Sequence, residues 1–235
     1  MSTLRWVPTG LFTDQVGLAN QVRNLLLEAV TAGHLRPGDR INEAELARRL
    51  GISRNPIREA VSGLAQKGFL VAIPRRGHFL RSFTRQDLDD IFSFRICVET
   101  FAIRQAMERM GQGGIDLIQA IYDRMVVAAE AVDLTRLHQA DIDFHRAVCE
   151  LSGNRQTARA HQGLETELRM LIAYVDLEQE SPMQSALVHR PIVEAVAAGD
   201  TARAVSAMEV HIRSTWSNIL AIYDEGPVKP TKKGR

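Results

Sequence analysis

The stretch LRPGDRINEAELARRLGISRNPIREAVSGLAQKGFLVAIPRRGHFL, residues 35–80, decides the fold of the first part of the chain. A short helical segment, Glu43–Leu50, stops at Gly51, and Ser53 is a good N-cap for a further helix that runs to about Lys67. Two β-like runs follow at residues 69–73 and 78–82, joined by Pro-Arg-Arg-Gly, which is a hairpin signal. Two helices around a tight turn, followed by a basic hairpin, predict a winged helix-turn-helix.

On both sides of this stretch the sequence reads as helical. Residues 14–32 carry one apolar stripe and should form a helix that ends at Gly33. Further helices are expected near residues 86–110, 114–131, 133–152, 155–178, 183–198 and 200–224. We therefore expect a mainly α chain with three parts. A winged helix-turn-helix of three helices plus a β-hairpin covers residues 12–82, an all-α bundle of about six helices covers 86–224, and a disordered basic tail covers 225–235.

Charge is divided unevenly along the chain. Residues 1–82 carry 12 Lys and Arg against 6 Asp and Glu, whereas residues 83–224 carry 13 against 21. A basic first third suggests that this part meets a polyanion, although solvated surface charge alone gives the same imbalance. No apolar run is long enough to span a bilayer, no secretory signal is visible, and Cys97 and Cys149 do not look like a disulfide framework. These features favour the cytoplasm.

The first helix turn after Ser53 carries side chains that can bind DNA. A recognition helix contacts bases and phosphates mainly from its N-terminal part, which here holds Ser53, Arg54, Asn55 and Arg58. The hairpin turn could add Arg75 and Arg76, with Gly77 allowing close approach of the main chain. The alternative is a solvated basic face. The capped entry, the apolar reverse face and the basic hairpin together favour DNA binding.

A second polar group lies in the helical part. Asp141 and His145 are four residues apart on one helix face, which suits either an ion pair or two metal ligands, whereas Asp143 lies on another face. His189 and His211 stand among apolar residues of the last two helices, where a histidine is usually a satisfied core group. If these helices meet, the four residues form a set of three imidazoles and one carboxylate. Such a set suits zinc first, with nickel or manganese as alternatives.

These motifs resemble a known family. Residues 15–80 are similar to the DNA-binding domain of GntR-type bacterial transcription regulators, through the Pro-Gly-Asp-Arg turn that ends at Arg40, the LGISRNPIREA run and the Arg-Gly hairpin. The resemblance implies that Arg54, Asn55, Arg58, Arg76 and Gly77 lie on DNA. Some relatives have an arginine where this chain has Ala44, so one DNA contact is expected to be absent and the operator to differ.

Residues 86–224 resemble the FCD effector domain of the FadR-type subgroup. The matching pieces are FRICVETFAIRQA, DIDFH, LSGN and HRPIVEAVAAGDTARAVSAMEVH. The resemblance implies an all-helical, homodimeric domain in which Asp141, His145, His189 and His211 bind one divalent metal beside a small carboxylate effector. Pro191, two residues after His189, lacks the N–H of a helix interior and should kink or start the helix there.

A carboxylate effector would also need a cation, and three arginines are candidates. Arg95 faces inward if the first helix of the bundle packs its apolar stripe, but a salt bridge with Glu99 is an equal alternative. Arg146 and Arg169 are weaker candidates. The expected function is therefore a DNA-binding transcription regulator that is not an enzyme. A metal-dependent hydrolase and a purely structural protein remain as alternatives, although no HExxH motif occurs.

Overall fold

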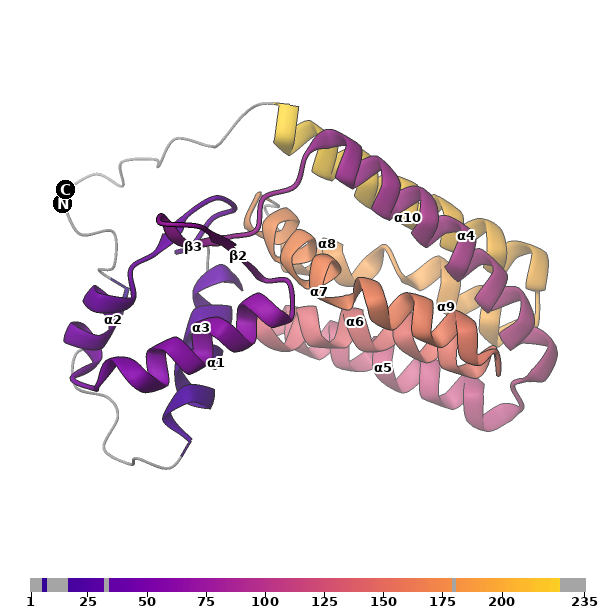
Figure 1. Ribbon diagram of the computed structural model, residues 1–235. Helices are drawn as coiled ribbons and strands as arrows, with labels where there is room; N and C mark the ends of the chain where they lie inside the picture. Colours follow the sequence, from indigo (N-terminus) through magenta and orange to yellow (C-terminus); the bar gives the residue numbers. More distant parts are fainter. Residues whose placement is uncertain (1–5, 8–16, 32–33, 179–180, 225–235) are drawn as a thin grey trace. The chain divides into compact units, whose positions relative to one another are not determined.

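The computed structural model describes residues 6–7, 17–31, 34–178 and 181–224, and they fall into two compact units. The first unit holds the chain up to Phe83 together with Thr166–Ala173, and the second holds Thr84–Glu165 and the chain from Tyr174 onward. The architecture is mainly helical, with one small three-stranded sheet in the N-terminal part of the chain, which confirms the predicted fold class (Figure 1). The expected domain start at residue 12, the helix end at Gly33 and the tail 225–235 lie outside the described residues.

The first unit has the expected helix-turn-helix. Its helices are α1 (Leu18–Thr31), α2 (Glu43–Leu50) and α3 (Arg54–Gln66). Gly51 ends α2 in the left-handed region, with φ 70°, which a residue with a side chain rarely adopts. The core between these helices is apolar and fully buried, and it includes Val22, Leu26, Leu46, Leu50, Ile57, Val61 and Leu64.

The wing is a sheet of three strands rather than a two-stranded hairpin. Its strands are β1 (Arg40–Ile41), β2 (Leu70–Ile73) and β3 (Gly77–Leu80), all antiparallel in the order β1-β3-β2. Arg40 pairs with Phe79, so the Pro-Gly-Asp-Arg turn leads directly into an edge strand. Strand β1 was not predicted, because two residues are too few to show an alternating pattern.

The second unit consists of the helices from α4 onward in the described residues, except for the Thr166–Ala173 stretch of α7, which belongs to the first unit. They are α4 (Arg85–Arg109), α5 (Gln112–Glu130), α6 (Leu134–Leu151), α7 (Arg155–Glu178), α8 (Pro182–Leu187), α9 (Arg190–Ala197) and α10 (Thr201–Asp224). Helix α4 begins at a capping box made by Thr84 and Asp87, and it packs along α10, while α5 packs along α6 (Figure 1).

One helix expected from the sequence is divided in two. Residues 183–198 were predicted as a single helix, but α8 ends at Leu187 and α9 begins at Arg190. His189 occupies the N-cap position of α9, and Pro191 lies in the first turn, where its missing N–H costs nothing. The break therefore follows from Pro191, and it places His189 at the start of a helix rather than in the middle of one. No helix in the described ranges is long and apolar enough to cross a membrane.

Candidate metal and DNA-binding sites

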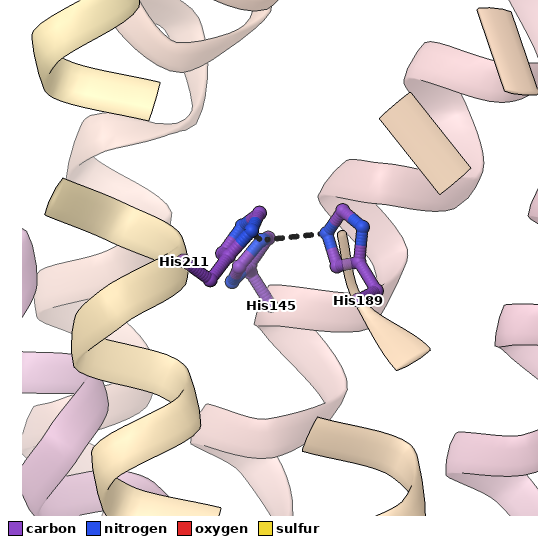
Figure 2. Close-up of side chains that lie close together, drawn as sticks. All are labelled: His145, His189 and His211. Carbon is purple, nitrogen blue, oxygen red and sulfur yellow. Dashed lines mark hydrogen bonds between the residues drawn. The ribbon is translucent and has the colours of Figure 1, made fainter. Parts of the chain in front are cut away.

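Three histidines from three helices converge in the interior of the second unit. His145 lies on α6, His189 at the start of α9 and His211 on α10, and all three are buried (Figure 2). The Nε2 atom of His145 is 3.3 Å from that of His189 and 3.2 Å from that of His211. One ligand atom from each of the three lies within 4.8 Å of the others, a spacing that suits coordination of a single ion.

Hydrogen bonds at the opposite ring nitrogens set the tautomers of two of these histidines. His145 Nδ1 lies 2.5 Å from Oε2 of Glu99, and His189 Nδ1 lies 3.1 Å from the carbonyl oxygen of Ser185. An ionised carboxylate and a carbonyl can only accept, so both Nδ1 atoms carry the proton. Burial lowers the pKa of His145 although the charge of Glu99 acts to raise it, so this ring is neutral near pH 7. Its Nε2 therefore presents a lone pair.

The result is a cluster of acceptors facing one another. Asp141 Oδ1 lies 3.2 Å from His189 Nε2, and its Oδ2 is buried without a hydrogen-bond partner among the described residues. With the proton on Nδ1, the Nε2 of His189 faces both Asp141 and His145 with a lone pair, and no hydrogen bond can join such pairs. A divalent cation satisfies all of these atoms together. The donor set therefore fits the metal that the sequence motif implied, with the carboxylate reaching the cluster beside His189.

The carboxylate behind His145 is itself held by an arginine. Arg95, which is 1% exposed, donates from Nε to Oε1 of Glu99 at 2.5 Å, so the salt bridge that the sequence offered as one of two equal alternatives is present on α4. Burial acts to raise the pKa of Glu99, but Arg95 and His145 overcome it and hold the pKa well below its usual range. Arg95 Nη2 is buried and has no hydrogen-bond partner among the described residues. The N–H groups of this nitrogen are therefore not used by the salt bridge, in which Nε donates.

The N-terminal part of α3 presents an exposed polar face in the first unit. Ser53, Arg54, Asn55 and Arg58 are all exposed there, and Ser53 stands at the N-cap position without making a cap hydrogen bond. A hollow of about 540 Å³ lies between α2 and the start of α3, lined in part by Ser53 and Arg54. This is the placement that a helix entering a DNA groove requires.

The wing adds further cations to the same unit. Arg75 and Arg76 are exposed at the turn between β2 and β3, and Arg76 lies over the ring of Phe79 at 5.5 Å. Gly77 has φ 99°, and a Cβ there would lie 3.7 Å from the guanidinium of Arg40. That distance is an ordinary contact, so it is the left-handed backbone of this turn that favours a glycine at position 77.

Comparison with known proteins identifies the family of the chain. Residues 18–80 match the family model of bacterial regulatory proteins of the gntR family, and residues 90–214 match that of the FCD domain. The chain belongs to the GntR family of bacterial transcription regulators. This GntR-family regulator is 30% identical to a probable D-xylose utilization operon transcriptional repressor of Paenarthrobacter nicotinovorans, over 83% of this chain and 85% of that protein.

Other relatives agree with this placement. The regulator is 31% identical to an HTH-type transcriptional regulator in an unstable DNA locus of Streptomyces ambofaciens, over 86% of this chain and 85% of that protein. Its fold is similar to that of McbR/YncC of Escherichia coli, with a TM-score of 0.68 and 22% identity over 89% of this chain and all of that one. The winged helix-turn-helix and the FCD-type bundle thus occur in the order that the motifs predicted.

The three arginines proposed for the effector are placed differently in the GntR-family chain. Arg95 is connected to the histidine cluster through Glu99, which accepts hydrogen bonds from both Arg95 and His145. Arg146 is bonded to Asp143 and lies 3.8 Å from Glu165, with its side chain 36% exposed. Arg169 belongs to the stretch of α7 that is part of the first unit. Only Arg95 among the three is thereby joined to a metal-site histidine.

Two residues of the site were missed at the level of sequence. Glu99 was recognised as a partner of Arg95 but not as the acceptor for His145. His161 on α7 was not considered at all. It is 1% exposed, its Nε2 lies 3.9 Å from Oε1 of Glu99, and neither ring nitrogen has a hydrogen-bond partner in the described part of the chain. Its position four residues after Thr157 and seven before Leu168, both buried, was the signal that it faces inward.

Proposed function

We propose that this transcription regulator binds its operator as a homodimer and that a small carboxylate, bound beside a divalent metal in the helical domain, modulates its affinity for DNA. The observation that carries the proposal is the convergence of the Nε2 atoms of His145, His189 and His211 beside Asp141. A set of four protein ligands made of three imidazoles and one carboxylate suits zinc, and nickel or manganese are the alternatives. The metal, when bound, offers a Lewis-acidic centre for a carboxylate oxygen.

The protein's own groups would orient and bind the effector. Glu99 fixes the ring of His145, so that its lone pair points to the ion, and Arg95 in turn fixes Glu99. The unpartnered Nη2 of Arg95 is a buried cationic donor, and such a donor gains most from an anionic acceptor. A ligand that carries at least one carboxylate therefore matches both the metal and Arg95. Arg146 and Arg169 stay as secondary candidates.

DNA binding is assigned to α3 and the wing. Ser53, Arg54, Asn55 and Arg58 would contact the major groove, and Arg40, Arg75, Arg76 and Gly77 the adjoining backbone or minor groove. Glu43 on α2 lies 3.8 Å from Arg58 Nε and 3.1 Å from His78 Nδ1, so it holds α3 and the wing in register. An effector alters this binding only if it prefers one arrangement of the dimer.

The metalloenzyme alternative has weaker support. Hydrolysis by metal-bound water calls for a general base near the ion. The one extra carboxylate in the motif, Asp143, is bonded to Arg146 and to Gln139 and contacts Arg124, so its charge is directed away from the histidines. The FCD relatives are regulators, which favours the sensor.

The decisive experiment measures metal content and operator binding in the same preparations. Purified protein should carry about one metal per chain, and His145→Ala and His211→Ala should each lose it, whereas His34→Ala in the first unit should keep it. Fluorescence anisotropy with the upstream DNA of the protein's own gene then screens small organic acids with and without chelator. An acid that changes operator affinity only in the metal-loaded protein supports the proposal. Full metal content in both histidine variants would refute it.

A further inference from the structure

One carboxylate of the first unit lies between the wing and the recognition helix. Glu43 is the first residue of α2, and its side chain is 25% exposed. Its Oε1 lies 3.1 Å from Nδ1 of His78 on β3, and its Oε2 lies 3.8 Å from Nε of Arg58 on α3. The two oxygens of a single carboxylate therefore face the two elements to which the proposed function assigns DNA.

A negative charge at this position opposes DNA binding unless cations balance it. The phosphates of DNA are anions, and the cations of a protein supply a large part of its affinity for them. The ion pair of Glu43 with Arg58 is attractive at 3.8 Å but too long for a hydrogen bond. The side chain of Arg58 is 66% exposed, so Glu43 holds its guanidinium near α2 while leaving it open to a ligand.

The charge of His78 decides how much of the charge of Glu43 falls to Arg58. An ionised carboxylate only accepts hydrogen bonds, so Nδ1 of His78 carries a proton, and Nε2 is the nitrogen that gains or loses one. Histidine is the side chain whose charge changes between about pH 5 and about pH 8. While the ring is neutral, Arg58 alone balances Glu43. When the ring is protonated, His78 balances Glu43, and the charge of Arg58 is left for the DNA.

The other neighbours of His78 do not take over this role. Across the sheet His78 pairs with Ile41 of β1 and Ala72 of β2, which carry no charge. The guanidinium of Arg40 lies beside Gly77, the residue before His78, and Arg76 precedes that glycine in the turn. Both are cations and disfavour a positive ring. Within the described residues, Glu43 is the carboxylate that contacts His78.

We infer that His78 is a positioning residue for operator recognition, which acts on Arg58 through Glu43. The inference rests on the DNA-binding face of the proposed function and names the pair of residues that controls Arg58 within it. Because DNA favours the more positive state of this group, binding takes up protons, to a limit of about one per chain. Operator affinity therefore falls as the pH rises through the range in which His78 loses its proton.

The first test is the pH profile of operator affinity, measured by fluorescence anisotropy on the full-length, metal-loaded protein at constant salt. Between about pH 6 and about pH 8, the native protein should lose about tenfold in affinity. His78→Gln keeps a neutral donor for Glu43 and should give a flat profile at the weaker affinity, whereas His78→Lys carries a permanent cation and should give a flat profile at the tighter one. His34→Gln replaces an exposed histidine of the same unit and should keep the native profile. An equal pH dependence in the native protein and His78→Gln overturns the inference.

The second test asks whether His78 acts through Glu43. Glu43→Gln keeps the size of the side chain but removes its charge, so non-operator DNA should be bound about fivefold more tightly, and the ratio of operator to non-operator affinity should fall. In the Glu43→Gln background, His78→Gln should change this ratio by less than about twofold, because the two residues act as a unit. Glu28→Gln, at an exposed carboxylate of α1, is the control and should leave the ratio unchanged.

The outcomes separate this inference from the proposed function. Variants at positions 43 and 78 that lower the melting temperature but keep the native ratio and pH profile would have a structural role only, which overturns the inference. So would independent, additive effects of the two substitutions. In either case a native protein that binds its operator leaves the proposed function standing. A native protein that binds no operator at any pH overturns both.

Discussion

At the scale of single residues, the candidate metal site depends on side chains that are not ligands. Glu99 accepts from His145 and Arg95 at once, and without it the imidazole of His145 would be free to turn its Nδ1 toward the ion. A buried ion pair of this kind adds little net stability, but removal of one partner leaves an uncompensated charge. The pair of Arg95 and Glu99 therefore serves to orient His145. The free-energy cost of burying the two charges is offset by the hydrogen bonds that Glu99 accepts from Arg95 and His145.

His161 makes a testable contribution to acid sensitivity. Burial lowers its pKa from 6.5 to about 4, although Glu99 acts to raise it. The unfolded chain takes up a proton as the pH falls below 6.5, whereas the folded protein does so only near pH 4, so stability is lost across this window and is unaffected above it. In metal-free protein, His161→Asn should reduce the loss of unfolding free energy between about pH 7.5 and about pH 5 by about 2 kcal/mol. Urea unfolding at the two pH values measures it, and an equal loss in both proteins would contradict the assignment.

At the scale of elements, some helices and strands could be predicted from the sequence and others could not. The helices of the first unit were predicted to within a residue or two where they are described, because glycines, caps and apolar spacing lie in the chain itself. Strand β1 was not predicted, and the break at His189 was expected only as a kink or helix start at Pro191 within a helix given as residues 183–198. The first exists only through pairing with β3, and the second required weighing one proline against a long apolar pattern.

The wing turn offers a prediction at this scale. Gly77→Ala forces a side chain into φ 99° beside Arg40, so we expect operator affinity to fall by about fivefold, which corresponds to about 1 kcal/mol of strain. Metal content should be unchanged, because the cluster lies in the other unit. The matched control is Gly163→Ala on α7, where a Cβ would meet nothing and should stabilise the helix by about 0.5–1 kcal/mol. Anisotropy titration and thermal unfolding of both variants separate the two effects.

At the scale of the whole molecule, the two units divide the work of the regulator. The basic first third carries the groups proposed for DNA, and the acidic remainder carries the cluster of histidines, which accords with the uneven charge of the sequence. The chain passes between the two units at the start of α4 and twice within α7, and α4 also carries Arg95 and Glu99.

A prediction for the whole assembly concerns salt. If Arg58 binds a phosphate in each half-site, Arg58→Ala should reduce the slope of log affinity against log salt by about 2 for the dimer, at every operator sequence tested. Arg213→Ala, which removes an exposed arginine of α10, is the control and should leave the slope unchanged. A slope that stays the same while discrimination at one base pair relaxes would place Arg58 on a base instead.

The sequence by itself determined the fold class, the helix-turn-helix and the identity of the four candidate ligands. These features can be predicted from residues that are near one another in the sequence. Caps, turns and the 3.6-residue period depend on neighbouring positions, and the family motifs are short. Only the tertiary structure decided that His145, His189 and His211 meet. It also decided that Glu99 orients the ring of His145 and that the ring of His161 lies near Glu99. The physical reason is that such contacts join residues up to 66 positions apart. They depend on how α4, α6, α7, α9 and α10 pack, which no local pattern specifies.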